Sequence, residues 1–84
     1  MPYIEEDYRT KFAPMLDICP EIDNKGELEY VIFSLMMKYM SNKEPRYTEL
    51  HNCVYATMHC ADEYRRRYLD VREDAARAKN GDIS

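Results

Sequence analysis

Apolar residues recur at helical spacing in one stretch of this 84-residue chain more clearly than anywhere else. Between residues 27 and 40 they form one stripe at i, i+3, i+4, i+7, i+8 and i+11: Leu28, Val31, Ile32, Leu35, Met36 and Tyr39. This spacing is typical of an amphipathic helix. Asn24 and Gly26 precede the stripe and Pro45 follows it, so the sequence predicts a helix over residues 27–40.

A second periodic segment begins near Thr48, a residue type that caps helices. One face of this segment carries Leu50, Val54 and Met58. The pattern predicts a second helix over about 48–68 or longer, with Asn80-Gly81 as a stop. A helix unbroken to Lys79 would be about 45 Å long, too long for so small a protein to cover. Either it bends near Leu69–Val71, or its far end packs on another chain.

The first quarter of the chain has a weaker helical stripe, formed by Ile4, Tyr8 and Phe12. Pro14 either breaks this stripe or begins a short second helix over 14–18. No pair of alternating apolar runs flanks a hairpin turn, so strands are not expected. The predicted fold class is all-α, in a single domain over residues 1–84: a helical hairpin, about 27–40 and 48–68 or longer, covered by a short N-terminal helix.

Self-association is expected from the size of the chain. A core this small seldom supplies more than ~3–5 kcal/mol, and the three cysteines show no Cys-x-x-Cys spacing. Residues 31–37 place apolar groups on more than one helical face, which favours a homo-oligomer. The predicted oligomer interface comprises Phe33, Met37 and Met40. The alternative is that these three pack under the N-terminal segment.

Charge and hydropathy exclude several kinds of partner. The net charge of −4 argues against binding of long nucleic acid. Residues 1–44 carry the whole excess of acidic over basic side chains, because residues 45–84 hold seven of each. Both glycines stand alone, so no glycine-rich phosphate loop forms. The longest apolar run, residues 31–37, is far below the ~20 that a spanning helix needs. With an acidic, polar start, the chain is expected to be intracellular, without a membrane partner.

Metal binding and catalysis are not expected. His51 and His59 lie eight residues apart and Cys53 and Cys60 seven apart, so none of these pairs has the i, i+4 spacing of two ligands on one helix face. His59 adjoins Cys60, but neighbouring helical residues do not face each other. His59 is expected to pair with Glu63 on the helix surface. We predict no metal, no cofactor and no enzymatic activity.

The remaining feature is the run Tyr64-Arg65-Arg66-Arg67-Tyr68. Arginine offers planar, bidentate donors for phosphate, and tyrosine offers a stacking face. The predicted ligand-binding residues are Tyr64, Arg65, Arg66 and Tyr68. Two alternatives stay open. Arg66 could pair with Asp62 or Asp70 while its neighbours are solvated, or the run could bind a protein partner.

The whole chain also resembles a group of small phage and prophage proteins of unknown function. The resemblance rests on Met1-Pro2-Tyr3-Ile4, Gly26-Glu27-Leu28-Glu29-Tyr30-Val31-Ile32, Glu63-Tyr64-Arg65-Arg66, Glu73-Asp74 and Asn80-Gly81-Asp82-Ile83. It implies a phage protein in the host cytoplasm that acts by binding. Such a protein would sequester a small phosphorylated nucleotide signal or block a host defence protein. The alternative is a structural or interaction module without a small-molecule ligand, with the acidic first half engaging a basic host surface.

Overall fold

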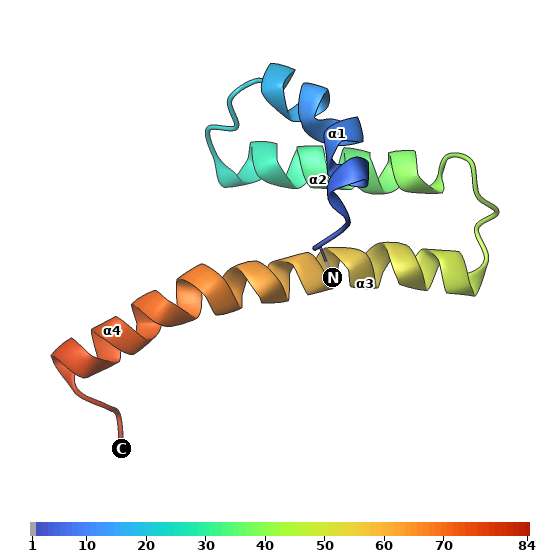
Figure 1. Cartoon of the computed structure of the whole chain (residues 1–84). Coiled ribbons are helices and arrows are strands. Elements are labelled where there is room, and N and C mark those ends of the chain that lie inside the picture. The colour runs from blue at the N-terminus through green and yellow to red at the C-terminus, as the bar shows by residue number, and fades with distance from the viewer. Residues whose placement is uncertain (1) are drawn as a thin grey trace.

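The computed structural model describes residues 2–84, and within them it contains helices and no strand. The helices are α1 (Glu6–Ile18), α2 (Lys25–Met40), α3 (Tyr47–Tyr64) and α4 (Asp70–Asn80) (Figure 1). A π-helical turn, η1 (Arg65–Leu69), joins α3 to α4, so residues 47–80 run as one long rod. The predicted all-α class is confirmed.

Helix α2 begins with a reciprocal cap. The side chain of Asn24 accepts a hydrogen bond of 2.9 Å from the backbone N–H of Glu27, and Glu27 Oε1 accepts one of 2.9 Å from the N–H of Asp23. These two bonds satisfy amide groups that have no partner inside the helix. The helix therefore begins at Lys25, two residues earlier than predicted, and ends at Met40 as predicted.

The long rod differs from the prediction at its start. Arg46 is the N-cap residue, and its side chain forms no capping hydrogen bond. Thr48, the predicted cap, lies within the first turn of α3. The rod runs on past Leu69–Val71 and changes direction gently beyond α3 (Figure 1). It ends at Gly81, whose N–H donates a 2.8 Å bond to the carbonyl of Arg77. Its φ of 93° suits glycine, so the predicted stop is confirmed.

Helices α2 and α3 form the predicted antiparallel hairpin. Within residues 2–84 only Cys53 is buried, with 6% of its surface exposed. Its thiol lies 3.7 Å from the carbonyl oxygen of Met36. Ile32 and Met40 lie one turn either side of Met36 and are half-buried, so they share the face of α2 that meets α3. Met40 therefore belongs to this seam.

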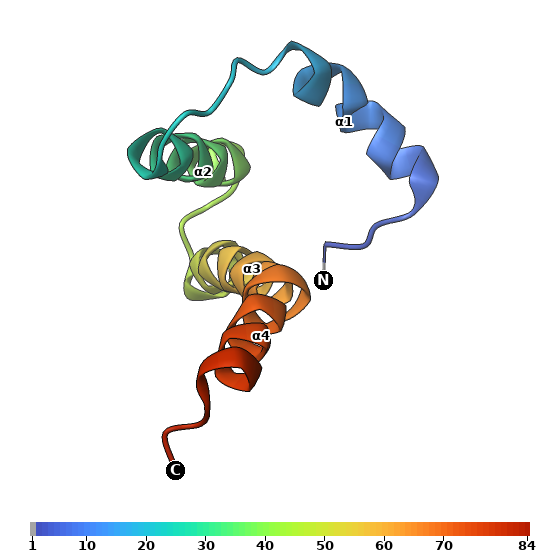
Figure 2. The same cartoon turned by 90° about the vertical axis from the view of Figure 1, so that its left-hand side faces the viewer.

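Helix α1 does not cover the hairpin, and that prediction is wrong. No Cα atom of α1 lies within 8 Å of a Cα atom in another helix. Figure 2, which looks along the hairpin, shows α1 standing apart on one side of it. Pro14 lies inside α1 and neither breaks it nor starts a second helix. Because α1 is exposed throughout, water can satisfy the carbonyl group that proline leaves without a donor.

The single chain is far from compact. Its accessible surface is 8024 Å² and its radius of gyration is 16.8 Å. A folded monomer of this mass exposes about 5,300 Å², and a compact domain of this length has a radius of gyration of about 12 Å. Phe33 and Met37 are 63% and 62% exposed, so they do not pack under the N-terminal segment. Every helix in residues 2–84 is too short or too polar to cross a membrane.

Candidate functional site

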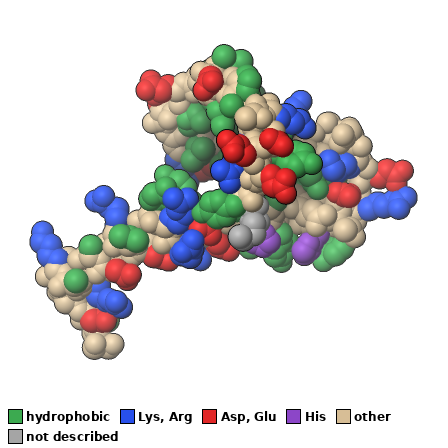
Figure 3. All heavy atoms as spheres, viewed as in Figure 1, with side chains coloured by type: hydrophobic (Ala, Val, Ile, Leu, Met, Phe, Trp, Pro, Cys, Tyr) green, Lys and Arg blue, Asp and Glu red, His purple; other side chains and the backbone are tan. Residues whose placement is uncertain are grey.

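The candidate site is a groove of about 270 Å³ where the N-terminal segment meets the long rod. Its lining comes from two parts of the chain that are some 60 residues apart: Pro2, Tyr3, Cys60, Glu63, Tyr64, Arg67 and Tyr68. Figure 3 shows Lys and Arg side chains gathered over this part of the rod, next to hydrophobic ones. We call this feature the Arg67 groove.

The π-helical turn shapes one wall of the groove. A π turn holds more residues than an α turn, and such turns occur frequently at functional sites. Tyr64 and Tyr68 stay neighbours across it, with ring centroids 4.6 Å apart and planes tilted by 47°. The guanidinium carbon of Arg67 lies 5.3 Å from the centroid of the Tyr68 ring. A cation and two aromatic faces therefore share one wall.

Tyr3 supplies the opposite wall and ties it to the rod. Its hydroxyl donates a 3.0 Å hydrogen bond to Glu63 Oε1 and accepts one of 3.1 Å from Arg67 Nη1. Arg66 also donates to Glu63 Oε1. We call this set of four side chains, Tyr3, Glu63, Arg66 and Arg67, the Tyr3 network.

The Tyr3 network is electrostatically polarised. The hydrogen bonds from Arg66 and then Tyr3 stabilise the charged form of Glu63 and lower the pKa of that carboxyl. The hydrogen bond to the Tyr3 oxygen in turn raises the pKa of Arg67. The Glu63 side chain is only 18% exposed, so it meets its partners partly shielded from water. At neutral pH the groove thus holds an ionised carboxylate and a permanent cation.

The structure places only two of the four predicted ligand-binding residues in the groove. Tyr64 and Tyr68 line the Arg67 groove, whereas Arg65 and Arg66 do not. Arg65 pairs with Asp62 at 3.2 Å, and Arg66 pairs with Glu63. Pairing of Arg66 with Asp62 or Asp70 is therefore wrong.

Sequence reasoning found only Tyr64 and Tyr68 among the residues that line the groove, and the two most important ones it missed are Tyr3 and Arg67. Tyr3 had no local pattern that could reveal a contact with a residue 60 positions away. Within the described residues Arg67 forms no direct ion pair, unlike Arg65 and Arg66, and it is linked to the Glu63 carboxylate only through the Tyr3 hydroxyl that both bond to. The predicted pair of His59 with Glu63 is also wrong, because Glu63 bonds to Tyr3 and Arg66. His59 instead lies edge-on to Tyr55, with ring centroids 6.2 Å apart.

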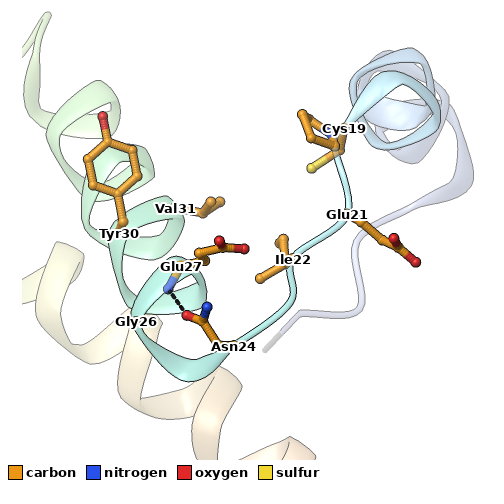
Figure 4. Close-up of a pocket in the computed structure, with 9 residues that line it drawn as sticks. Cys19, Glu21, Ile22, Asn24, Gly26, Glu27, Tyr30 and Val31 are labelled. Carbon is orange, nitrogen blue, oxygen red and sulfur yellow. Dashed lines mark hydrogen bonds between the residues drawn. The ribbon is translucent and has the colours of Figure 1, made fainter.

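A larger hollow of about 590 Å³ lies between the α1–α2 loop and the start of α2 (Figure 4). It contains no lysine or arginine, and its carboxylates are Glu21 and Glu27. Asn24 and Glu27 already form the cap of α2 there. The Arg67 groove therefore has the more distinctive chemistry.

No cluster of three or more His, Cys, Asp or Glu side chains suited to a metal ion occurs in residues 2–84. Cys19 and Cys60 are exposed free thiols. His51 stacks on Tyr55, with ring centroids 4.0 Å apart. The Arg67 groove therefore offers a guanidinium that can bind an anionic group. Beside it are tyrosine faces on which a flat ring can stack.

Comparison with known proteins gives one match. The family model described as a domain of unknown function, DUF6899, matches residues 1–83. No curated protein and no solved structure matches the chain. The predicted likeness to a group of proteins of unknown function is confirmed, while phage origin stays a prediction.

Proposed function

The chain belongs to the DUF6899 family, and we propose that it is a non-enzymatic, homo-oligomeric protein that binds a small phosphorylated nucleotide in the Arg67 groove. In the cytoplasm of a phage-infected host, such binding would sequester a nucleotide signal of a defence system. The single observation that carries this proposal is the position of Arg67, a cation that forms no direct ion pair within the described residues, beside the tyrosine rings of the groove.

The chemistry of the groove fits the two parts of a nucleotide. A guanidinium binds phosphate oxygens through two parallel hydrogen bonds, at a geometry that lysine does not offer. Bases stack on tyrosine rings whatever their sequence. Tyr68 lies close enough to Arg67 for one ligand to contact both. In this arrangement Arg67 would exchange its bond to the neutral Tyr3 hydroxyl for bonds to phosphate.

The size of the groove favours a small ligand. Sites for small molecules usually have volumes of about 300–1,000 Å³, and the Arg67 groove has about 270 Å³. It suits a mononucleotide or one half of a cyclic dinucleotide. Long nucleic acid is disfavoured by the net charge of −4, because phosphate backbones need a wide basic surface.

The test is isothermal titration calorimetry of the full chain with mononucleotides and cyclic mono- and dinucleotides. We expect saturable binding of at least one of them, and at least a tenfold loss of affinity in Arg67→Ala. The matched control is Arg72→Ala, which removes an exposed arginine of α4 outside the groove. The absence of heat with every nucleotide, or an equal loss in both variants, would contradict the proposal.

A second candidate function is a protein-interaction or assembly module without a small-molecule ligand, which would act by blocking a host protein or by building a larger structure. The large exposed surface favours it, since the total accessible area of 8024 Å² is about 2,700 Å² more than a compact monomer exposes. Native mass spectrometry separates the two candidates. A co-purified nucleotide on the oligomer supports the first, whereas an oligomer that neither retains nor binds any nucleotide supports the second.

A further inference from the structure

Two exposed apolar stripes lie on the hairpin, one on each helix. On α2, Phe33 and Met37 are one turn apart and are 63% and 62% exposed. On α3, Leu50, Val54 and Met58 recur every four residues and are 46%, 47% and 48% exposed. Side chains this large and apolar are normally buried in a folded protein.

The two stripes lie on the same side of the hairpin. Met36 of α2 meets Cys53 of α3, and these residues mark where the helices face each other. Met37 is rotated by about 100° from Met36, and Val54 by about 100° in the same sense from Cys53. Because the helices are antiparallel, equal rotations measured along each chain turn both side chains toward one side. We call these five residues, Phe33, Met37, Leu50, Val54 and Met58, the hairpin face.

Nothing within residues 2–84 covers the hairpin face. Glu63, where Tyr3 attaches, is rotated from Cys53 in the opposite sense, so the N-terminal segment reaches the other side of the hairpin. Figure 2 likewise shows α1 on one side of the hairpin only. The apolar surface on the remaining side is therefore left without an intramolecular partner.

We infer that the hairpin face is the surface on which a second copy of this chain packs, so that two hairpins form a four-helix bundle. A specific interface buries about 800 Å² on each partner. The whole chain exposes about 2,700 Å² more than a compact monomer of its mass, and the hairpin face contributes part of that excess, so a partner on this face would bring the chain closer to ordinary burial. One self-complementary face satisfies both copies, as in most symmetric dimers.

Charge places no obstacle to this pairing. The five residues of the hairpin face are uncharged, and an acidic residue one turn beyond the stripe on each helix is paired within its own chain. Asp62, one turn beyond Met58, pairs with Arg65 at 3.2 Å. Glu29, one turn before Phe33, pairs with Lys25 at 3.5 Å. The face itself therefore adds no like-charge repulsion between two copies, although each chain has a net charge of −4.

This inference deepens the homo-oligomer of the proposed function by naming its surface, and it does not depend on the nucleotide. It differs from the predicted interface of Phe33, Met37 and Met40. Met40 lies in the seam between α2 and α3, whereas three residues of α3 join the surface.

The test measures the mass of the full chain in solution by sedimentation equilibrium at micromolar concentration. We expect about twice the chain mass of 10.1 kDa. Val54→Arg and Met37→Arg each place a charge in the hairpin face, so we expect at least tenfold weaker association. The matched control is Leu16→Arg on α1, where a 67% exposed leucine lies outside the face and the dimer should persist.

A second measurement uses the unaltered protein, in case an arginine variant fails to fold. Mild peroxide oxidation followed by mass spectrometry reports how accessible each methionine is. Met37 and Met58 should react slowly at micromolar concentration and faster on dilution. Met15 of α1, 43% exposed, should react equally at both concentrations.

A monomer at micromolar concentration overturns the inference. So does a dimer that Leu16→Arg dissolves while Val54→Arg and Met37→Arg preserve it, or equal oxidation of all three methionines. None of these outcomes bears on the nucleotide titration.

Discussion

The hairpin and the N-terminal region are held in place by different forces. Helices α2 and α3 meet through apolar and half-buried side chains around Cys53. In the N-terminal region, residues 2–18, helix α1 makes no close backbone approach to another helix, since none of its Cα atoms lies within 8 Å of a Cα atom in α2, α3 or α4. The attachment of this region to the rod is polar, through the hydroxyl of Tyr3. Apolar packing changes little with pH, whereas hydrogen bonds to an ionised carboxylate depend on it.

This difference bears on the proposed function because the Arg67 groove uses both regions. One wall belongs to the long rod, and the other belongs to Tyr3. A ligand that bonds to Arg67 competes with Tyr3 for the same guanidinium. Binding can therefore change the N-terminal region without disturbing the hairpin. The following variants and conditions test whether the two regions are as separable as their contacts suggest.

The largest effect is expected at the centre of the hairpin. Cys53→Asp would place a carboxylate at the one buried position in residues 2–84, beside the carbonyl oxygen of Met36. Burying a charge without a partner should lower the free energy of unfolding by about 3 kcal/mol. Urea denaturation followed by far-ultraviolet circular dichroism, at one fixed protein concentration, measures the change. Cys19→Asp, at an exposed cysteine, should change it by less than about 0.5 kcal/mol. Equal effects of the two variants would refute a packed hairpin seam.

A smaller effect is expected where α2 begins. Asn24→Ala removes the side-chain acceptor for the N–H of Glu27 and should lower the free energy of unfolding by about 1 kcal/mol. The same urea denaturation measures it. Asn42→Ala is the control, because Asn42 lies in the α2–α3 loop and accepts only a 3.2 Å bond from Lys43. A loss in the Asn42 variant as large as that in the Asn24 variant would argue against a specific capping role.

Sequence reasoning predicted the hairpin because its helices are amphipathic over several turns. The stripe from Leu28 to Tyr39 and the stop at Gly81 both depend on local chemistry, and both agree with the structure. The cap of α3 was misplaced because Arg46 occupies that position without any capping side-chain bond. The weaker stripe of Ile4, Tyr8 and Phe12 also predicted a short N-terminal helix, and α1 confirms a helix there.

The candidate site was harder to predict, because it depends on long-range contacts and on an irregular turn. Periodicity identifies apolar residues but not their partner, so α1 was wrongly expected to cover the hairpin. A prediction from i, i+4 spacing holds only for a regular α-helix. The π-helical turn changes the direction of every side chain after Tyr64 relative to such a helix. Composition alone does not say which of three consecutive arginines reaches the groove, and it is Arg67, not the predicted Arg65 or Arg66, that lines it.

The smallest effect, and the one that most directly separates the two regions, is expected on acidification. The pKa of Glu63 lies below the ordinary glutamate value of 4.5 because Arg66 and Tyr3 donate hydrogen bonds to its charged form. Since the pKa is lowered in the folded protein, the stabilisation is complete above the ordinary value and is lost as the pH falls through the lowered one. As the pH is lowered from neutral to below the ordinary glutamate pKa of 4.5 and on through the lowered one, we therefore expect Tyr3 to detach from the rod while helical content stays constant.

Nuclear magnetic resonance can follow this detachment through the ring signals of Tyr3 and the side-chain carboxyl carbon of Glu63, with circular dichroism as the measure of helix. In Glu63→Gln the side chain no longer ionises, so the Tyr3 signals should lose their acid transition. If the Tyr3 signals and the helical signal instead changed together, the N-terminal region and the hairpin would be one cooperative unit. The Tyr3 wall of the Arg67 groove would then be as rigid as the rod, and a ligand could not displace it without unfolding the hairpin.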